Sequence, residues 1–251
     1  HPGDEGEGFQ VGILRFDCIE KGKKWKISFS GKMEGENGIK EVDFDLEFNA
    51  KSPVIDFANA MIVESTAKSI AEAKWSKKFF EKLKDSQKQH FEQGGEIAGK
   101  VTIDGAVKEV KWDSLRDHSW GIRKWGGWKR HVWVCGMLED GNCFNMSMVK
   151  YDYMGQLSAG FITEGDQIHY LREFPEIEDF ASDPIFPEKL DLKLKYSNGK
   201  EYHLQTERRA FVPYNMDNEY RINEGVSFGS LNGVKTKLVT EFGFNPKHYD
   251  L

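Results

Sequence analysis

The chain has 251 residues, of which 39% are hydrophobic and 30% charged, as is typical of a soluble protein with one large or two smaller domains. Its net charge of −6 argues against a nucleic-acid partner, because neutralising phosphates needs a basic face. No apolar run approaches the roughly 20 residues that cross a bilayer, so we expect no membrane span. The sequence opens with His-Pro, which favours a processed chain or a fragment.

Alternation of apolar and polar residues with a period of two predicts β-strands along most of the chain. The pattern is clearest in residues 24–29, 41–48 and 190–195, where each strand has one apolar and one polar face. Such strands are typical of antiparallel sheets with one face in water. We therefore predict an all-β protein of roughly a dozen antiparallel strands.

One segment interrupts the strands. Residues 64–86 are rich in helix formers and carry Trp75, Phe79 and Leu83 at four-residue spacing, and Ser76 is a suitable N-cap for a second helix. We predict one broken helix or two short ones, in an insert of about residues 57–86. The insert is either a lid over a barrel mouth or a plug at one end.

Turn dipeptides set the expected hairpin registers. A three-residue loop of residues 197–199, with Gly199 left-handed, pairs Leu194 with Tyr202. A two-residue turn at Asp140-Gly141 pairs Met137 with Phe144. The second register places six apolar side chains on one face: Trp133, Cys135, Met137, Phe144, Met146 and Met148. This face fits the wall of a pocket for a flexible apolar ligand, and it fits a plain core equally well.

The same register has consequences for glycosylation and for the cysteines. It turns Asn145, the acceptor of an Asn-Met-Ser sequon, away from the apolar face, so we expect glycosylation there. It places Cys135 and Cys143 on opposite faces, so we expect no bond between them. With Cys18 there are three cysteines, so at least one has no partner within the chain. Either all three are free thiols, as in a cytoplasmic protein, or the leftover cysteine forms a disulfide with a partner or a second copy. We expect a secreted protein, with the cytoplasm as the alternative, and no metal site, because no Cys/His spacing suits zinc.

The stretch from Ser114 to Arg130, SLRDHSWGIRKWGGWKR, differs from the rest of the chain. Asp117 and His118 are candidates for acid–base chemistry if the protein is an enzyme. A serine-hydrolase triad is excluded, because neighbouring Asp, His and Ser in a strand point to opposite faces. In a strand, Arg116 and His118 share one face. The structural alternative is a buried Arg–Asp pair that fixes the seam between two β units.

Tryptophan is concentrated in and around this stretch. Five of the seven tryptophans lie within one short span: Trp112, Trp120, Trp125, Trp128 and Trp133. Tryptophan combines a large apolar area with an N–H that needs a partner, which suits the wall of a ligand pocket.

The residues SLRDHSWGIRKW resemble the R-D-H-S-[WF]-G-x-R-x-W signature of the lipocalin-like superfamily that includes carotenoid 1,2-hydratase (CrtC) and AttH-type proteins. Residues 75–105 and 127–141 are similar to the non-catalytic region of invertebrate phosphoenolpyruvate-synthase-like proteins. The resemblance implies two consecutive lipocalin-like β-barrel or sheet units and an apolar cavity for isoprenoids, carotenoids or other lipids. Lys124 departs from the family pattern, which weakens transfer of an acid–base role.

These observations lead to one hypothesis with two alternatives. We expect an N-terminal unit of residues 1–122 with the helical insert and a C-terminal unit of residues 123–251. The protein is expected to be a non-enzymatic carrier of a long apolar ligand, an isoprenoid, carotenoid or other lipid, with no required cofactor; with a carotenoid as the ligand it would be a carotenoprotein. The alternatives are an isoprenoid hydratase or isomerase using Asp117 and His118, and an accessory domain of a phosphoenolpyruvate-synthase-like protein. The expected ligand contacts are Trp112, Arg116, His118, Trp120, Trp125, Trp128, Trp133, Met137, Phe144, Met146 and Met148.

Overall fold

The structure is a computed structural model that describes residues 8–35, 37–85, 89–121, 124–177 and 186–249. In these ranges the chain forms fifteen β-strands, two short α-helices and two 3₁₀ turns. Every strand pairing for which a register is defined is antiparallel. The predicted fold class, all-β and antiparallel with a short helical insert, is confirmed.

The chain divides into two compact units: residues 1–54 with 93–116, and residues 55–92 with 117–251. The predicted boundary at 122/123 falls on two residues outside the described part of the chain. The helical insert lies in the second of these units, because the chain leaves the first unit after residue 54, builds the insert, and returns along strand β6.

The first unit is an antiparallel sheet in the order β1-β2-β3-β4-β6, with β7 paired to β6. Its strands, of which β6 and β7 continue into the second unit, are β1 (Phe9–Val11), β2 (Leu14–Glu20), β3 (Lys24–Gly35), β4 (Gly38–Ala50), β6 (Gln89–Ile103) and β7 (Ala106–Trp120). The expected alternation is present, since Val42, Leu46 and Phe48 are buried while Asp43 and Asp45 are exposed.

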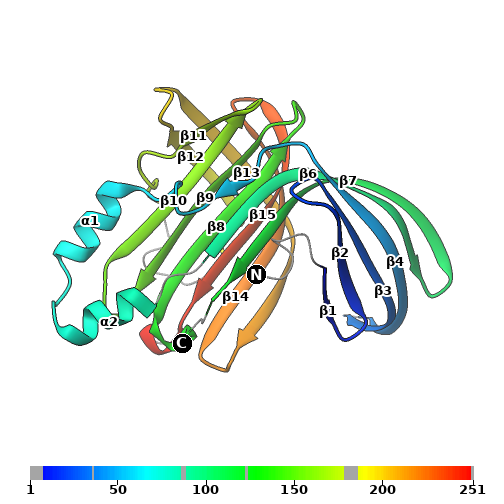
Figure 1. Ribbon diagram of the computed structural model, residues 1–251, viewed down its shortest axis with the longest axis horizontal. Coiled ribbons are helices and arrows are strands. Elements are labelled where there is room, and N and C mark those ends of the chain that lie inside the picture. The colour runs from blue at the N-terminus through cyan, green and yellow to red at the C-terminus, as the bar shows by residue number, and fades with distance from the viewer. Residues whose placement is uncertain (1–7, 36, 86–88, 122–123, 178–185, 250–251) are drawn as a thin grey trace. The chain divides into compact units, whose positions relative to one another are not determined.

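The second unit contains an eight-stranded curled sheet in the order β11-β10-β9-β8-β15-β14-β13-β12 (Figure 1). Its strands are β8 (Trp128–Leu138), β9 (Cys143–Tyr151), β10 (Gln156–Glu164), β11 (Gln167–Tyr170), β12 (Lys189–Lys195), β13 (Glu201–Met216), β14 (Tyr220–Leu231) and β15 (Val234–Phe244). The same unit holds β5 (Ile55–Asp56), α1 (Val63–Ala71), α2 (Lys77–Asp85) and the 3₁₀ turns η1 (Trp125–Gly127) and η2 (Pro246–His248).

The largest core of the described chain lies on one face of this curled sheet. Buried side chains from β8, β9 and β10 pack with leucines and aromatic rings from β12 to β15. Among them are Val134, Met146, Leu194 and Phe242, each at most 1% exposed. Burial of this apolar area is the main force that holds the sheet in its curled form.

The loop of residues 197–199 has the predicted geometry. Leu194 pairs with Tyr202, the backbone N–H of Gly199 donates to Tyr196, and Gly199 has a φ of +79°. The Asn198 side chain accepts from the N–H of Lys200. A glycine in the left-handed region closes such three-residue loops without steric cost.

The register predicted at Asp140-Gly141 is wrong by one residue. Met137 pairs with Cys143 rather than Phe144, because residues 139–141 form a three-residue loop of the same kind. Gly141 has a φ of +89°, and Asp140 accepts from the N–H of Asn142. Side chains alternate with a period of two, so the one-residue difference moves every β9 side chain to the other face.

The predicted apolar face is therefore divided between the two sides of the sheet. Trp133, Cys135 and Met137 share a side with Cys143, Asn145 and Ser147. Phe144, Met146 and Met148 lie on the other side, in the large core. Cys135 and Cys143 are thus on the same face, contrary to our expectation. Both side chains are buried, Cys18 is partly buried, and none of the three cysteines forms a disulfide; burial raises the pKa of Cys135.

The insert forms two helices, as predicted. α1 packs on β10, where the hydroxyls of Ser65 and Ser69 donate to the carbonyl oxygen of Gln156. Ser76 caps α2 by accepting from the N–H of Phe79. Phe79 is buried, but Trp75, which we placed on the same apolar face, is 62% exposed because it precedes the helix.

Replacing Gly141 by Ala tests the loop geometry. A β-carbon in the left-handed region is strained, so Gly141→Ala should lower the free energy of unfolding by about 1–2 kcal/mol, measured by urea denaturation. Gly127→Ala is the matched control, because an added Cβ there meets only Asp152 Oδ1 at 3.8 Å. Equal stability of the two variants would contradict the assigned loop.

Candidate functional site

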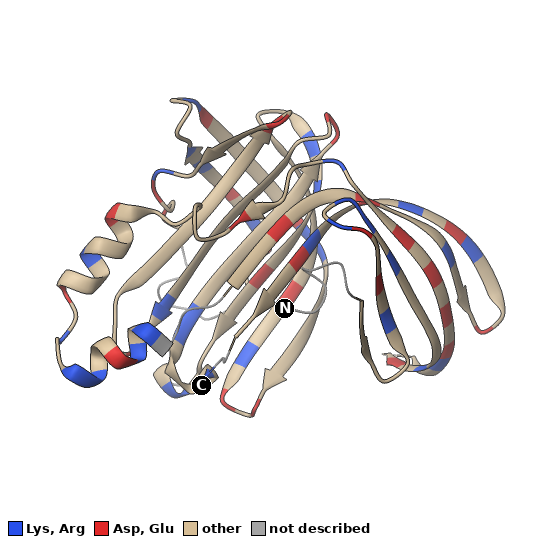
Figure 2. Ribbon diagram, viewed as in Figure 1, with Lys and Arg blue, Asp and Glu red and all other residues tan. Residues whose placement is uncertain are grey.

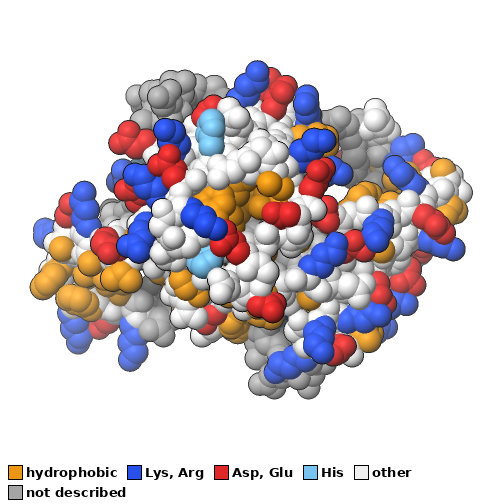
Figure 3. All heavy atoms as spheres, turned by 90° about the horizontal axis from the view of Figure 1, so that it is seen from above, with side chains coloured by type: hydrophobic (Ala, Val, Ile, Leu, Met, Phe, Trp, Pro, Cys, Tyr) orange, Lys and Arg blue, Asp and Glu red, His pale blue; other side chains and the backbone are white. Residues whose placement is uncertain are grey.

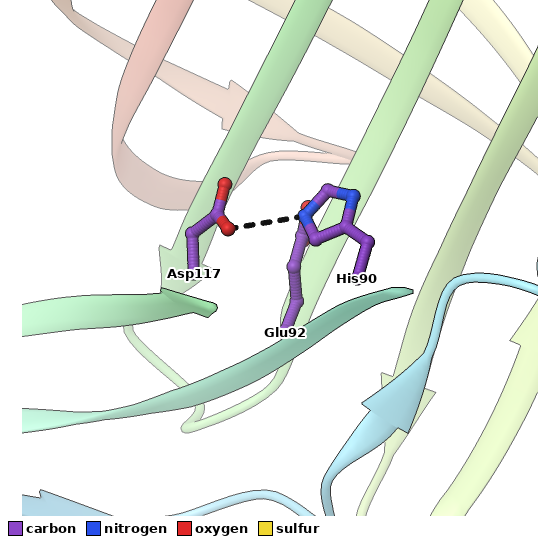
Figure 4. A group of neighbouring side chains, drawn as sticks. All are labelled: His90, Glu92 and Asp117. Atoms are coloured by element: carbon purple, nitrogen blue, oxygen red, sulfur yellow. Dashed lines mark ion pairs between the residues drawn. The ribbon is translucent and has the colours of Figure 1, made fainter. Parts of the chain in front are cut away.

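The second unit contains a cluster of three ionisable side chains from two neighbouring strands (Figure 4). His90 and Glu92 come from the first residues of β6, and Asp117 comes from β7. His90 and Glu92 are two residues apart in an extended strand, so both side chains point to the same side. We call His90, Glu92 and Asp117 the acidic cluster. Asp117 is the aspartate of the RDHSW stretch.

Glu92 is fully buried, and the curled sheet supplies its hydrogen bonds. The indole N–H of Trp133 on β8 donates to Glu92 Oε1 at 2.7 Å, and the amide of Asn145 on β9 donates to the same oxygen at 3.1 Å. Glu92 Oε2 and Asn145 Oδ1 are both buried and have no hydrogen-bond partner in the described part of the chain. Buried acceptors without donors are rare in proteins, so these two oxygens are exceptions that call for a physical explanation.

Burial raises the pKa of Glu92, although His90 opposes the change. For His90, burial alone would lower the pKa, but Asp117 and Glu92 outweigh it and raise the pKa to about 9. His90 Nε2 lies 3.3 Å from Glu92 Oε1 and 3.3 Å from Asp117 Oδ1. The imidazole therefore contacts a buried carboxyl group and one whose side chain is 40% exposed.

This placement suits proton transfer between solvent and a buried carboxyl group. A proton taken up at Asp117 can pass through the imidazole to Glu92, because one ring nitrogen lies close to both carboxylates. The three side chains could also hold a divalent cation, since their ligand atoms all lie within 4.8 Å of one another. We predicted no metal site from the sequence, and His90 and Glu92 were not among the predicted site residues.

Aromatic rings surround the acidic cluster. The ring of Phe57 stacks on His90 with centroids 4.1 Å apart, and Phe161 meets Phe57 edge to face. Phe57 and Phe161 belong to a small core with Ile55, Met137 and Ala159 on the same side of the sheet as Trp133. The cluster is thus a polar site in largely apolar surroundings.

The predicted site residues lie in several separate places. Trp112 is exposed on β7, and the Arg116 guanidinium lies over Trp25 in the first unit. The rings of His118 and Trp120 are neighbours, and Trp120 also lies near Phe91. Trp125 and Trp128 pack around Tyr220. The structure brings Trp133 and Asp117 to the acidic cluster, and it does not assemble the predicted residues into one wall.

Asn145 has a different environment from the one expected. The side chain is fully buried and its amide donates to Glu92, so the prediction that it turns away from the face of Trp133 and Cys135 is wrong. The error follows from the hairpin register, which turns Asn145 to the side of Trp133 and Cys135. A glycan has no room on a fully buried side chain.

A second polar network lies on the same side of the curled sheet. His131 Nδ1 is 2.7 Å from the hydroxyl of Tyr220, and His131 Nε2 bonds to Glu241. Glu241 is directly opposite Trp133 on the neighbouring strand. Gly243 makes room for the imidazole, since a Cβ there would lie 2.2 Å from it. Tyr220 and His131 are buried and paired, so we assign this network a structural role.

Comparisons with known proteins give a family and a fold. The family described as a domain of unknown function, DUF7064, matches residues 1–239. No protein with a curated description matches the chain. A crystal structure described as a candidate AttH from Nitrosomonas europaea matches with a TM-score of 0.59 and 9% identity, covering 94% of this chain and 68% of that one. At this identity the match supports the lipocalin-like fold alone.

The raised pKa of His90 predicts a pH dependence of stability. A group with a pKa of about 9 when folded and 6.5 when unfolded stabilises the fold fully below pH 6.5, and this contribution is lost as the pH rises to about 9. The raised pKa of Glu92 acts in the same direction. The free energy of unfolding should fall by up to about 3 kcal/mol over this range, measured by urea denaturation.

In His90→Gln this decrease should largely disappear. His203→Gln is the matched control, because His203 forms an exposed ion pair with Asp191. A wild-type stability that is constant or rises between these pH values would contradict the assigned protonation of the acidic cluster.

Proposed function

The chain belongs to the DUF7064 family, and we propose that it binds an apolar molecule of the isoprenoid or lipid class and transfers a proton to it from Glu92. The proposal is carried by one observation. A fully buried carboxyl group, with one oxygen unpartnered among the described residues, lies 3.3 Å from a histidine that also contacts a half-exposed carboxylate. Burial raises the pKa of such a group and so favours its protonated form, which can act as a general acid.

The residues of the acidic cluster have distinct roles in this proposal. Trp133 and Asn145 hold Glu92 Oε1, which leaves Oε2 to carry the reacting proton. His90 lies between Glu92 Oε1 and Asp117 and can exchange protons between them, whereas the proton used at Oε2 is returned to Glu92 by the reaction itself. His118, which we considered as the acid or base from the sequence, contacts Trp120 and is replaced in this role by His90.

The reaction class follows from a buried acid in apolar surroundings. The Glu92 proton adds to one carbon of a C=C bond, whose π electrons form the new C–H bond and leave a carbocation on the other carbon. In hydration, water adds to the carbocation and then loses a proton to Glu92. In isomerisation, a C–H bond next to the carbocation loses its proton to Glu92, and a double bond forms at the new position. Aromatic faces such as Phe57 and Trp133 stabilise positive charge nearby.

The isoprenoid class of substrate is supported by the resemblance of the RDHSW stretch to carotenoid 1,2-hydratase and related proteins. The lipocalin-like fold agrees with this resemblance. His90 contacts the proposed proton donor, Glu92, and it also contacts Asp117, which belongs to the stretch that carries the resemblance.

Deuterium incorporation tests the proposal. The protein is incubated in D₂O with acyclic isoprenoids that contain trisubstituted double bonds, and the products are analysed by mass spectrometry. The wild type should place deuterium on carbon, and Glu92→Gln should reduce the rate by at least about 100-fold, because an amide cannot act as the acid. Glu96→Gln, on the same strand and paired with Lys51 and Lys111, should keep the rate. Incorporation that is absent in the wild type, or unchanged in Glu92→Gln, would refute the proposal.

A non-enzymatic carrier is the second candidate, and exposed apolar side chains on the curled sheet favour it. Strands β13 and β14 expose Val212, Tyr214, Val226 and Phe228 on one side of the sheet, each more than 40% accessible. Such a surface can contact a long apolar molecule, a carotenoid included.

Extraction of the purified protein into organic solvent separates the two candidates. A carrier should release a stoichiometric apolar molecule, and Glu92→Gln should retain the same compound unaltered. Visible absorption of the intact protein identifies a carotenoid. A lipid-free wild type, purified from its native source, would exclude the carrier.

A further inference from the structure

The helical insert carries exposed aromatic rings that the acidic cluster does not use. Trp75 is 62% exposed and Phe80 48% exposed, and the two rings meet edge to face at 5.8 Å. The indole N–H of Trp75 donates to the carbonyl oxygen of Ile70 at 2.7 Å, so the ring is held in its exposed position. Figure 3 shows hydrophobic side chains gathered among lysines at the left end of the view, where α1 and α2 lie.

Lysines surround these rings and an open depression beside them. The depression has a volume of about 520 Å³ and lies between α2 and the neighbouring ends of β8 and β9. Phe79, Tyr151 and Met154 form its apolar floor. Its rim carries five lysines and two carboxylates: Lys74, Lys78, Lys82, Lys129, Lys150, Glu72 and Asp152. Blue segments of the ribbon mark Lys and Arg positions on α2 and the adjoining strand ends in Figure 2.

The positive charges of the five rim lysines are not neutralised by ion pairs among the described residues. In the part of the chain that the structure describes, none of the five forms an ion pair, and Lys82 lies over the ring of Tyr153 at 4.8 Å. Several surface lysines elsewhere lie next to a carboxylate, as Lys24 lies next to Glu47. A protein with a net charge of −6 thus concentrates unpaired positive charge at one end of the second unit.

We propose that α2 and this depression dock on a membrane surface that contains anionic phospholipids. Trp75 and Phe80 enter the interface, and the rim lysines contact lipid phosphates. Neither described α-helix has the length or the apolar character needed to cross a bilayer. The proposed contact is therefore peripheral, and it does not depend on the function proposed for the acidic cluster.

The combination of charge and aromatic rings favours a lipid surface over other anionic partners. Basic helices with Trp or Phe on one side lie in the plane of the membrane interface. Each lysine near an anionic leaflet adds to the attraction, and long lysine side chains reach headgroups while their stems cover apolar surface. A free phosphate would use the lysines but would leave Trp75 and Phe80 in water.

Vesicle sedimentation tests this proposal with the full chain. The protein should sediment with vesicles of phosphatidylcholine mixed with phosphatidylserine and remain in solution with phosphatidylcholine alone. Raising the salt to about 0.5 M should weaken the association, because screening acts on exposed charges. The fluorescence of the wild type should shift to the blue on binding, and the shift should be lost in Trp75→Phe.

Two pairs of variants separate the contributions of charge and rings. The double variant Lys78→Glu/Lys82→Glu should bind at least about tenfold more weakly, whereas Lys235→Glu/Lys237→Glu on β15 should bind like the wild type. Trp75→Ser should also weaken binding, whereas Trp112→Ser, at a tryptophan 49% exposed in the first unit, should not. Circular dichroism checks that each variant is folded.

Three results would overturn the proposal: equal binding to both kinds of vesicle, equal binding by the charge-reversed variant and its control, and no vesicle binding. Calorimetry with inorganic phosphate distinguishes a free phosphate ion from a lipid headgroup as the ligand of the lysines. Binding of inorganic phosphate without vesicle binding would assign the depression to a free anion and would also overturn the membrane proposal.

Discussion

The second unit is organised around a carboxyl group that cannot be solvated. Glu92 has no exposed surface, so hydrogen bonds must offset the free-energy cost of burying its carboxyl group. Trp133 and Asn145 of the curled sheet donate these hydrogen bonds. These donors come from strands β8 and β9, whereas Glu92 comes from β6. The insert is fixed nearby through Ile55, which pairs with Glu92 on β6. Placement of the acid thus requires three distant segments of sequence to fold together.

Much of the fold could be predicted from local sequence. Period-two alternation found the strands because one face of each is apolar, and the helix formers with Ser76 found the insert. The loops at residues 139–141 and 197–199 differ in how well local sequence predicts the hairpin register. Both are three-residue loops with a left-handed glycine, and both have an Asx side chain that accepts from the N–H two residues on. Matching apolar faces identified the second loop, but Met137 fits an apolar partner in either register.

The candidate site was predicted only in part. The RDHSW stretch identified Asp117, but not its partners, because His90 and Glu92 are 27 and 25 residues earlier in the chain. The alternating polar residues of QHFEQ, Gln89 to Gln93, were the available signal, since charged residues two apart in a strand share a face. Which carboxylate becomes buried depends on the packing of β6 against β8 and β9. That information lies in tertiary contacts rather than in the spacing of residues.

The length of the loop at residues 139–141 determines which side chain of β9 reaches the Glu92 carboxyl group. With three residues in the loop, Asn145 lies on the side of Trp133 and reaches Glu92. With two residues, Phe144 would occupy that side, and Asn145 would enter the large core without its partner. The first arrangement satisfies a buried acceptor, whereas the second buries an unpaired amide and removes a donor from Glu92. Solvation of one buried acid therefore selects the register of the whole hairpin, and the exposed glycine at Gly141 permits it.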